Sequence, residues 1–481
     1  MNKPVSLSGL VGLLVTVILA ACQPLSPTHQ SASPPNIILI IGDGMDDHQL
    51  TIARNYAVGY QGQLTLDTLP QRRAVKVLTV GETSPHKPVF VADSANSATA
   101  IATGVVTSRG RIGTTAGSDE DIPNLIELAH QVGIKTGIVT TASVTDATPA
   151  AFYAHIRNRF CQSPSRLQGE TPWGQYPSCE YESKANGGSG SIAEQLIDSG
   201  VDITLGGGLN YFQDSVPEQS STATQQTLLQ EAEDVGYRVV TEWQQLKTIN
   251  AQIRDSEKLL GLFAPSTLPV KLIGDNPEQG VAQQAEARGQ EAAPFHCIPN
   301  PAFNQTPSLK TLTDTALNHL QNSPNGFFLM IESASIDKQS HLRRPCGHIG
   351  ETLQLDEAVA SALAFAETNP NTLILVTADH GQAAQLVPDI SLFAASNQSI
   401  YSPGHSARVI TPSGDVMRIN YATSNVELEE HTGVQVPLLV GGSAINQVEI
   451  QPVLAQPALY EVMAAFMGIE MPSTNDEEDK K

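Results

Sequence analysis

The sequence predicts an α/β fold in which one large, mostly parallel central β-sheet is flanked by helices on both faces. Short apolar runs rich in β-branched residues recur along the chain, and segments with helical patterning separate them. Continuous apolar runs are typical of strands that are buried on both faces. Strands that alternate with helices favour parallel pairing, because each helix carries the chain back to the start of the next strand.

Five of these runs are the candidate strands, and a short acidic or histidine motif adjoins each of them. In open α/β sheets, ligands bind beyond the carboxyl ends of the strands. We therefore expect the motifs to meet at one edge of the sheet. The candidate strands are residues 36–41, 135–141, 327–331, 372–377 and 436–440.

The segment from Val91 to Gly104 predicts a helix that begins beside a serine. It is rich in alanine after Ser94 and contains no proline, and Asp93 or Ser94 suits the N-cap position. A hydroxyl at this place lies beside unpaired backbone N–H groups and the positive end of the helix dipole. That environment favours bound phosphate and a serine that attacks it. A capped helix that packs through small residues is the alternative interpretation.

Three further helices follow from apolar periodicity and from helix-start signals. Pro123 suits the first turn of a helix, where its missing N–H leaves no hydrogen bond unmade. The section 210–306 is less regular and richer in Gln, Pro and Glu, so we expect an insertion with some helix at the edge of the domain. The predicted helices are residues 123–131, 150–159 and 353–367.

The composition limits the class of protein. The chain has 481 residues, 40% of them hydrophobic, which is enough for a sizeable core. Its formal net charge is −22, and its 27 basic residues form no run, which excludes nucleic acid as a partner. Such acidity is typical of a soluble exported protein, and bound cations would neutralise part of it.

Both ends of the chain have the patterns of segments outside the folded domain. Residues 1–21 resemble a lipoprotein signal peptide, because an apolar stretch too short to span a bilayer ends in a lipobox-like Leu-Ala-Ala-Cys. We expect Cys22 to be lipidated, although an ordinary cleaved signal peptide is the alternative. The protein would then lie in the periplasm or cell envelope, and Gln23 favours the outer membrane. Residues 22–35 predict a flexible tether, and residues 472–481 predict an acidic disordered tail.

Four cysteines remain if Cys22 is lipidated. An even number in an exported protein indicates two disulfides. Three pairings are open, and the sequence does not choose among them. A bond between Cys161 and Cys179 is attractive, because the loop between them is short and rich in Pro, Ser and Gly.

Acidic and histidine side chains at the predicted strand ends indicate a metal centre. Asp337 and His341 are four residues apart, so one helical turn would place both on the same face. Mixed carboxylate and imidazole ligation is typical of zinc, whereas carboxylate and hydroxyl oxygens suit magnesium. One Asp-His pair alone would more often be a solvated loop. The predicted centre contains Asp43, Glu332, Asp337, His341, Asp379, His380 and His431.

Clustered divalent ions suit phosphoryl transfer, because they stabilise both the entering and the leaving oxygen. Arg159 lies at the end of the predicted helix that follows Thr148. Its planar guanidinium could hold two phosphate oxygens at once, which a lysine cannot do. A surface salt bridge is the alternative interpretation of Arg159.

Five motifs occur in an order that resembles alkaline phosphatases, and the bacterial periplasmic form most closely. The resemblance extends from about Asn36 to Gly468 and includes residues 187–212 and 347–358. It implies a three-layer α/β sandwich, with residues 36–471 as the catalytic domain. The motifs are residues 41–45, 93–99, 332–341, 377–381 and 431–433.

The resemblance implies metal-dependent hydrolysis of phosphate monoesters through a phosphoserine at Ser94. Arg159 would hold the phosphate, and Asp146 and Lys338 match positions that tune magnesium and phosphate binding. Two Zn²⁺ ions and one Mg²⁺ ion are the implied cofactors. The implied ligands are Asp337, His341 and His431 for one zinc, Asp43, Asp379, His380 and Ser94 for the second, and Asp43, Thr148 and Glu332 for magnesium.

The family pattern also implies a homodimer and selects one pairing of the cysteines, Cys161–Cys179 with Cys297–Cys346. Asp46 and Ser333 depart from the pattern, which usually has glycine at both positions. Neither matches a ligand position, so their effect stays open.

Two other functions fit parts of the sequence. A phosphodiesterase or sulfatase of the same superfamily would share the fold. Common sulfatases, however, need a modifiable residue in a Cys/Ser-x-Pro-x-Arg pattern, and Ser94 is followed by Ala-Asn-Ser. Diesterases of this superfamily commonly use threonine as the nucleophile. A non-catalytic lipoprotein that binds phosphate or metal would explain the acidity and the anchor, but not Ser94 together with Arg159.

Overall fold

The computed structural model describes residues 33–171, 174–175, 177–214, 226–249, 257–276, 280–284, 292–393 and 404–470. The predicted signal peptide, Cys22, the tether up to residue 32 and the tail 472–481 lie outside these residues. Among the described residues, no helix combines the length and the hydrophobicity that a membrane crossing requires.

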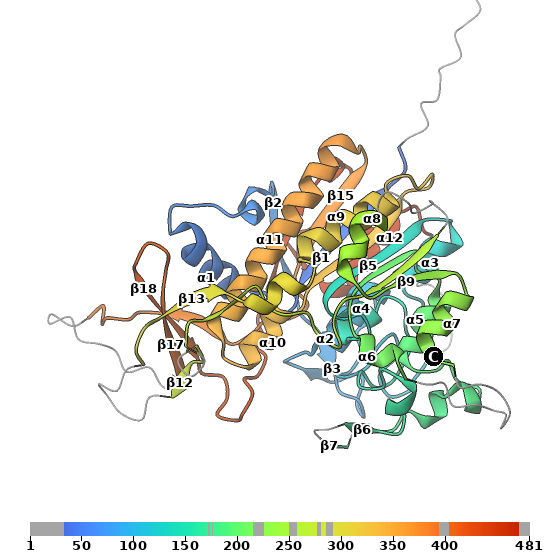
Figure 1. Ribbon diagram of the computed structural model, residues 1–481, viewed down its shortest axis with the longest axis horizontal. Coiled ribbons are helices and arrows are strands. Elements are labelled where there is room, and N and C mark those ends of the chain that lie inside the picture. The colour runs from blue at the N-terminus through green and yellow to red at the C-terminus, as the bar shows by residue number, and fades with distance from the viewer. Residues whose placement is uncertain are drawn as a thin grey trace, which may run out of the picture. The chain divides into compact units, whose positions relative to one another are not determined.

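A ten-stranded sheet lies at the centre of the part of the chain that the structure describes (Figure 1). All neighbouring strands pair in parallel except at β19, which runs antiparallel to both of its neighbours. In spatial order the strands are β20 (Val453–Ala455), β2 (Gln71–Lys76), β19 (Val436–Gly441), β15 (Thr372–Thr377), β1 (Asn36–Gly42), β14 (Phe327–Ser333), β5 (Lys135–Ser143), β8 (Ile203–Gly207), β10 (Lys258–Leu262) and β9 (Tyr237–Val240).

The five predicted strands are β1, β5, β14, β15 and β19, and they are adjacent in the middle of the sheet. Every residue of β1, β14, β15 and β19 is buried, which explains why these strands have continuous apolar sequences. Because β19 is antiparallel to β15, the residues that precede β19 lie at the carboxyl end of β15. This reversal brings His431 to the same edge of the sheet as the motifs that follow the parallel strands.

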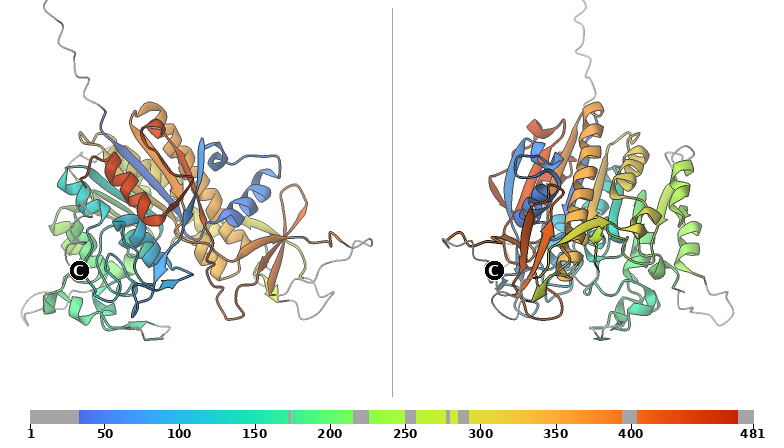
Figure 2. Two further views of the ribbon diagram at one scale, coloured as in Figure 1. Left: turned by 180° about the vertical axis from the view of Figure 1, so that it is seen from behind. Right: turned by 60° about the vertical axis from the view of Figure 1, so that its left-hand side comes forward.

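Helices cover both faces of the sheet, as the sequence predicts. Phe327 and Phe328 of β14 point to opposite faces, since successive strand residues alternate. Phe327 packs edge-on against Phe365 of α11 (Pro345–Thr368), and Phe328 stacks on Phe152, which follows α4 (Ala147–Ala150). Helix α9 (Leu309–Leu320) packs beside α11. In the opposite layer, α2 (Ser94–Thr103) contacts both α4 and α12 (Gln456–Phe466), and α12 faces the viewer in the left panel of Figure 2.

A second sheet contains β11 (Leu272–Gly274), β13 (Phe295–Pro299), β17 (His405–Ile410), β18 (Val416–Tyr421) and β16 (Ala384–Val387), with β12 (Gln283–Gln284) paired to β17. It packs through its own buried cluster against α1 (Asp47–Val58) and α11. The described parts of the section 210–306 divide between the two sheets, since β9 and β10 form the edge of the first and β11 to β13 belong to the second. The other elements are α3 (Leu125–Gln131), α5 (Ile192–Ser199), α6 (Leu209–Phe212), α7 (Leu228–Asp234), α8 (Leu246–Ile249), α10 (Ser335–His341), β3 (Thr79–Val80), β4 (Pro88–Val89), β6 (Glu170–Thr171) and β7 (Gly174–Gln175).

All three of these helix predictions were wrong in their bounds. Asn124 is the N-cap of α3, so Pro123 precedes the helix and does not occupy its first turn. The helix predicted over residues 150–159 is instead α4, which ends at Ala150. Beyond it, Ile156 forms a two-way backbone bridge with Ile112, at 2.8 and 3.0 Å, and this pairing holds the chain in an extended conformation. Helix α11 begins at Pro345, earlier than predicted.

Candidate active site

Ser94 is the first residue of α2, as the sequence predicts. The side chain of Asp93 caps the helix by accepting from the Asn96 N–H at 3.1 Å, and Asn96 in return accepts from the Asp93 N–H at 2.9 Å. All residues of α2 are buried, and most are small, which lets α4 and α12 approach closely. Ser94 Oγ lies 3.2 Å from Nε2 of His380. The helix start therefore presents a hydroxyl to the metal-type residues at the sheet edge.

Asp43 and Asp379 follow the adjacent strands β1 and β15 and converge on His380. His380 Nε2 lies 3.4 Å from Asp43 Oδ1 and 3.5 Å from Asp379 Oδ2. Gly44 has φ 68°, and a Cβ there would stand 3.1 Å from Cβ of Asp337, so glycine is needed at this turn. The Gly44 N–H donates to Asp379 Oδ1 at 3.0 Å and fixes that carboxylate.

Asp337, His341 and His431 form a second cluster. The two imidazole Nε2 atoms are 2.9 Å apart, and each lies 3.3 Å from an oxygen of Asp337. His431 Nδ1 donates to the Ala92 carbonyl at 2.9 Å, and His341 Nδ1 donates to the Glu429 carbonyl, so both Nε2 atoms face the carboxylate. Burial tends to raise the pKa of Asp337. Attraction to the two histidines outweighs burial and holds this pKa well below its ordinary value.

Thr148 and Glu332 are the two remaining predicted metal ligands, and both are buried. Glu332 is the sixth residue of β14, and its carboxylate accepts from the Thr140 hydroxyl. Thr148, in α4, is buried, and its hydroxyl oxygen makes no hydrogen bond with the described residues. The same is true of one buried oxygen each of Asp43 and Asp379. Buried oxygens without a partner are costly, so these atoms fit a site that binds cations.

Electrostatics lead to the same conclusion. Burial raises the pKa of Glu332 to about 8 and that of Asp43 well above its ordinary value, and repulsion from Asp379 also raises both. Carboxyl groups with such raised pKa values stay protonated near neutral pH unless a nearby positive charge stabilises the ionised form. Divalent ions would supply that charge. Within the part of the chain that the structure describes, two groups have ligand atoms close enough to share an ion, namely Asp337, His341 and His431, and Asp43, Asp337 and His380.

Arg159 is fixed beside Ser94 by two carboxylates. One terminal nitrogen donates to Asp93 Oδ2 at 3.2 Å, and the other donates to Asp146 Oδ1 at 3.2 Å. Asp146 also accepts from the Lys338 ammonium. Burial tends to raise the pKa of Asp146, but Lys338 and then Arg159 hold it well below its ordinary value. The two carboxylates thus hold the guanidinium of Arg159 in one orientation, although the helix predicted over residues 150–159 is not formed.

A cavity of about 600 Å³ connects these groups to solvent. Ser94, Arg159, Lys338, His341 and His431 line it. Among the predicted site residues, Asp337 lines the cavity as well, whereas Asp43 and Asp379 join the group behind it through His380, which contacts Ser94. Thr148 and Glu332 do not line the cavity. Sequence reasoning missed Thr140 and Gln382, whose side chain donates to Asp337 Oδ1 at 2.6 Å. It also missed the role of Asp93 as a partner of Arg159, although the N-cap pattern singled that residue out.

Asp46 and Ser333, the two departures from the family pattern, have structural roles. Asp46 is the N-cap of α1 and also accepts from the Gln382 N–H at 3.3 Å, which ties the start of α1 to the chain after His380. Burial raises the pKa of Asp46 to about 6. Ser333 donates to the Glu351 carbonyl at 3.0 Å and so links β14 to α11.

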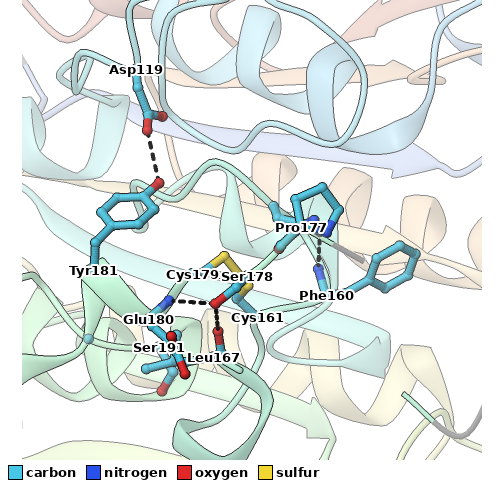
Figure 3. The surroundings of a disulfide bond; sticks show 12 residues. Asp119, Phe160, Cys161, Leu167, Pro177, Ser178, Cys179, Glu180, Tyr181 and Ser191 are labelled. Carbon is cyan, nitrogen blue, oxygen red and sulfur yellow. Dashed lines mark hydrogen bonds between the residues drawn. A yellow bond between two sulfur atoms is a disulfide. The ribbon is translucent and has the colours of Figure 1, made fainter. Parts of the chain in front are cut away.

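Both implied disulfides are present. Cys161 pairs with Cys179 across 18 residues, and Cys297 pairs with Cys346 across 49 residues. Figure 3 shows the first of them near Tyr181 and near Phe160, which lines the cavity. The second joins β13 of the smaller sheet to the start of α11.

Comparison with known proteins identifies the family. Residues 35–461 match alkaline phosphatase. The chain is 39% identical over 467 residues to streptomycin-6-phosphate phosphatase of Streptomyces griseus, which covers 95% of this chain and 96% of that protein. It is 38% identical over 443 residues to alkaline phosphatase of Escherichia coli, with 90% and 86% covered. The chain belongs to the alkaline phosphatase family.

Solved alkaline phosphatases share the fold. The enzyme from Thermus thermophilus superposes with a TM-score of 0.62 at 21% identity, covering 92% of this chain and 93% of that one. The enzyme from the Antarctic bacterium TAB5 gives a TM-score of 0.60 at 22% identity, with 92% and 99% covered.

Membership of the alkaline phosphatase family makes this protein a phosphomonoesterase, and the family is metal-dependent. The two relatives named above are phosphatases, so the sulfatase alternative loses its support. The matched residues 35–461 include every predicted metal ligand from Asp43 to His431.

Proposed function

We propose that this alkaline phosphatase hydrolyses phosphate monoesters through a phosphoserine at Ser94. The observation that carries the proposal is the placement of the Ser94 hydroxyl at the start of α2, 3.2 Å from His380 and in one cavity with Arg159. A buried hydroxyl between a metal-type cluster and a fixed guanidinium is well placed to attack phosphorus.

We further propose two Zn²⁺ sites and one Mg²⁺ site in this cavity. The donor chemistry supports the assignment, since the clusters with imidazole suit zinc, and the oxygen-only set with a hydroxyl suits magnesium. When bound, such ions neutralise phosphate charge, activate a water and stabilise the leaving oxygen. The proposed ligands are Asp337, His341 and His431, then Asp43, Asp379, His380 and Ser94, and finally Asp43, Thr148 and Glu332.

The chain's own residues divide the remaining work. Arg159 binds two oxygens of the transferred phosphoryl group, and Asp93 and Asp146 hold its guanidinium in place. Ser94 Oγ passes its proton to water and attacks phosphorus in line, while the ester oxygen leaves on the opposite side and takes a proton from water to become the alcohol. Water then hydrolyses the phosphoserine and releases inorganic phosphate. Lys338 and Asp146 tune how tightly that phosphate is held.

The test replaces the nucleophile and leaves the helix intact. Ser94→Ala should lower the turnover of p-nitrophenyl phosphate by roughly 10⁴-fold or more, because the covalent route is lost. Ser97→Ala is the matched control, since Ser97 is buried in the same helix and its hydroxyl makes no hydrogen bond with the described residues. Near-normal turnover by a folded Ser94→Ala variant would remove Ser94 from the mechanism.

We also propose a homodimer in the cell envelope, anchored by a lipid on Cys22. The lipobox-like sequence before Cys22 supports the anchor. The two disulfides support an oxidising compartment outside the cytoplasm. Cys22→Ser should release the protein from membranes and abolish labelling with a fatty-acid analogue, and sedimentation of the released protein measures its oligomeric state.

A further inference from the structure

The cavity is lined by more positive charge than the composition of the chain would suggest. The chain has a net charge of −22, yet Arg109, Arg111, Arg157, Arg159 and Lys338 all line this one opening. Glu82, Asp93 and Asp337 line the same opening, so the charge that a ligand meets depends on which cations are neutralised by carboxylates. A cation that no carboxylate of the protein neutralises can bind an anionic ligand.

Three of the five are neutralised by carboxylates of the protein. Arg159 and Lys338 share Asp146, as described above. Arg111 is buried and bonds to Glu82 at 2.6 Å, and it also forms an ion pair with Asp119. These groups are therefore structural or belong to the phosphate site.

Arg109 and Arg157 differ from the other three. Arg109 donates from Nε to the neutral Val91 carbonyl at 2.6 Å, and a second nitrogen donates to the same oxygen. The guanidinium of Arg157 lies 5.7 Å from the centre of the Tyr181 ring, over its face. Neither arginine forms an ion pair with a carboxylate among the described residues. Arg157 does act on Glu82, since its charge helps to lower the pKa of that carboxyl, but the direct partner of Glu82 is Arg111. The charges of Arg109 and Arg157 are therefore the least neutralised of the five.

Both arginines are held in place without being neutralised. The Tyr181 hydroxyl donates to Asp119 at 2.8 Å (Figure 3). This bond fixes the ring over which the Arg157 guanidinium lies. The Cys161–Cys179 disulfide ties the chain next to Phe160 to the chain next to Tyr181. Phe160 also lines the cavity and leaves 46% of its surface exposed. Arg109, Arg157 and Phe160, called the rim below, thus form a preorganised cationic surface with an apolar face.

We propose that Arg109 and Arg157 select phosphate monoesters whose leaving group carries a second anionic group, such as a carboxylate or another phosphate. This inference rests on the function proposed for Ser94. The scissile phosphate binds at Arg159 and Ser94, and the second anion of the same substrate meets the two arginines at the rim. Arg109 and Arg157 are specificity-determining residues and take no part in the chemical step.

The experiment compares three esters that differ mainly in the charge of the leaving group. These are 3-phosphoglycerate with a carboxylate, glycerol 3-phosphate with no charge and phosphocholine with a cation. At low ionic strength, kcat/KM should fall in that order, with about fivefold between the first two, the upper end of what an exposed ion pair contributes. Raising the ionic strength to about 0.15 M shortens the Debye length to roughly 8 Å and should shrink the preference.

Arg109→Gln and Arg157→Gln test the assignment, alone and together. The double variant should lose most of the preference between 3-phosphoglycerate and glycerol 3-phosphate while it keeps its turnover of glycerol 3-phosphate. Arg72→Gln is the matched control for net charge, because Arg72 is an exposed residue of β2 that pairs with Asp47. It should leave the preference unchanged.

Two results would overturn the inference. One is a wild-type enzyme with equal kcat/KM for the three esters, and the other is a double variant with an undiminished preference. Both leave the proposed function intact, since turnover that depends on Ser94 is measured separately with Ser94→Ala. Full turnover of all three esters by Ser94→Ala would instead contradict the proposed function.

Discussion

Arg343 brings a charge into the interior from a backbone conformation that few arginines adopt. Its φ is 54°, and its side chain is buried. The guanidinium donates to Glu429 at 2.7 Å and to the carbonyls of Val426 and Glu427 at 2.8 and 3.0 Å. The Glu429 N–H donates to the His341 carbonyl at 2.9 Å, and the Glu429 carbonyl accepts from Nδ1 of His341. One buried ion pair therefore holds the loop before His431 against the end of α10.

Loss of this arginine should destabilise the fold strongly. Arg343→Met leaves Glu429 buried without its cation, which should lower the free energy of unfolding by about 3–5 kcal/mol. The double variant Arg343→Met/Glu429→Gln should recover part of that loss, because no charge is then left unpaired. Denaturant unfolding measures both, with the exposed neighbour in Arg344→Met as the control. A stable single variant would show that the pair contributes nothing.

At the scale of elements, the sequence predicted the five adjacent strands in the middle of the main sheet and missed the others. One of the missed strands, β8, is buried throughout but ends in two glycines, which are more typical of a turn. Strands such as β1 and β15 have continuous apolar runs, whereas β2 carries Arg72 and Arg73 and lies near the edge of the sheet. The site was predictable for the same reason, because its motifs adjoin the central strands. The roles of Arg109 and Arg157 could not be predicted from the sequence, because their exposure to the cavity depends on partners that are distant in the chain.

The pair Glu127–His155 links α3 to the chain after α4 and should make stability depend on pH. Nε2 of His155 lies 3.0 Å from Glu127. Burial tends to lower the pKa of His155, but Glu127 raises it above 6.5. The contribution of His155 to the free energy of unfolding is therefore complete below pH 6.5, and it is lost as the pH rises through the pKa of the folded state. Burial tends to raise the pKa of Glu127, but His155 lowers it, so the contribution of Glu127 disappears only in acid.

Glu127→Gln should therefore cost more stability near the ordinary pKa of His155, 6.5, than in alkali. Since 43% of the Glu127 side chain is exposed, screening limits the effect to about 0.5–1 kcal/mol. Glutamine can still accept from the Asn124 N–H at the helix start, so the cap survives the change. Thermal melting of both proteins across the pH range checks this, and a difference that grows in alkali would contradict it.

At the scale of the whole molecule, we expect metal binding by the acidic cluster to stabilise the fold. Asp43, Glu332 and Asp379 are all buried at the ends of the central strands. Without cations their mutual repulsion acts on the middle of the main sheet. A ligand that binds only the folded state stabilises it by about 4 kcal/mol at a thousand times its dissociation constant.

Chelation should accordingly lower both activity and thermal stability, and zinc with magnesium should restore both. The Ser94→Ala variant separates the two effects, because it should still show the shift in melting temperature although it is inactive. Calorimetry with and without chelator makes the comparison. An unchanged melting temperature would mean that the cluster binds no structural cation.

The disulfide that closes the loop of residues 161–179 has a consequence for how such enzymes diversify. The reaction depends on residues supplied by the framework, which lie outside the loop between the two cysteines, and the disulfide fixes both ends of that loop, next to Phe160 and next to Tyr181. Such a segment can accumulate changes, or be exchanged between homologues as a cassette, without disturbing the hydrolytic machinery. Substrate range and chemical competence can then evolve separately on one scaffold.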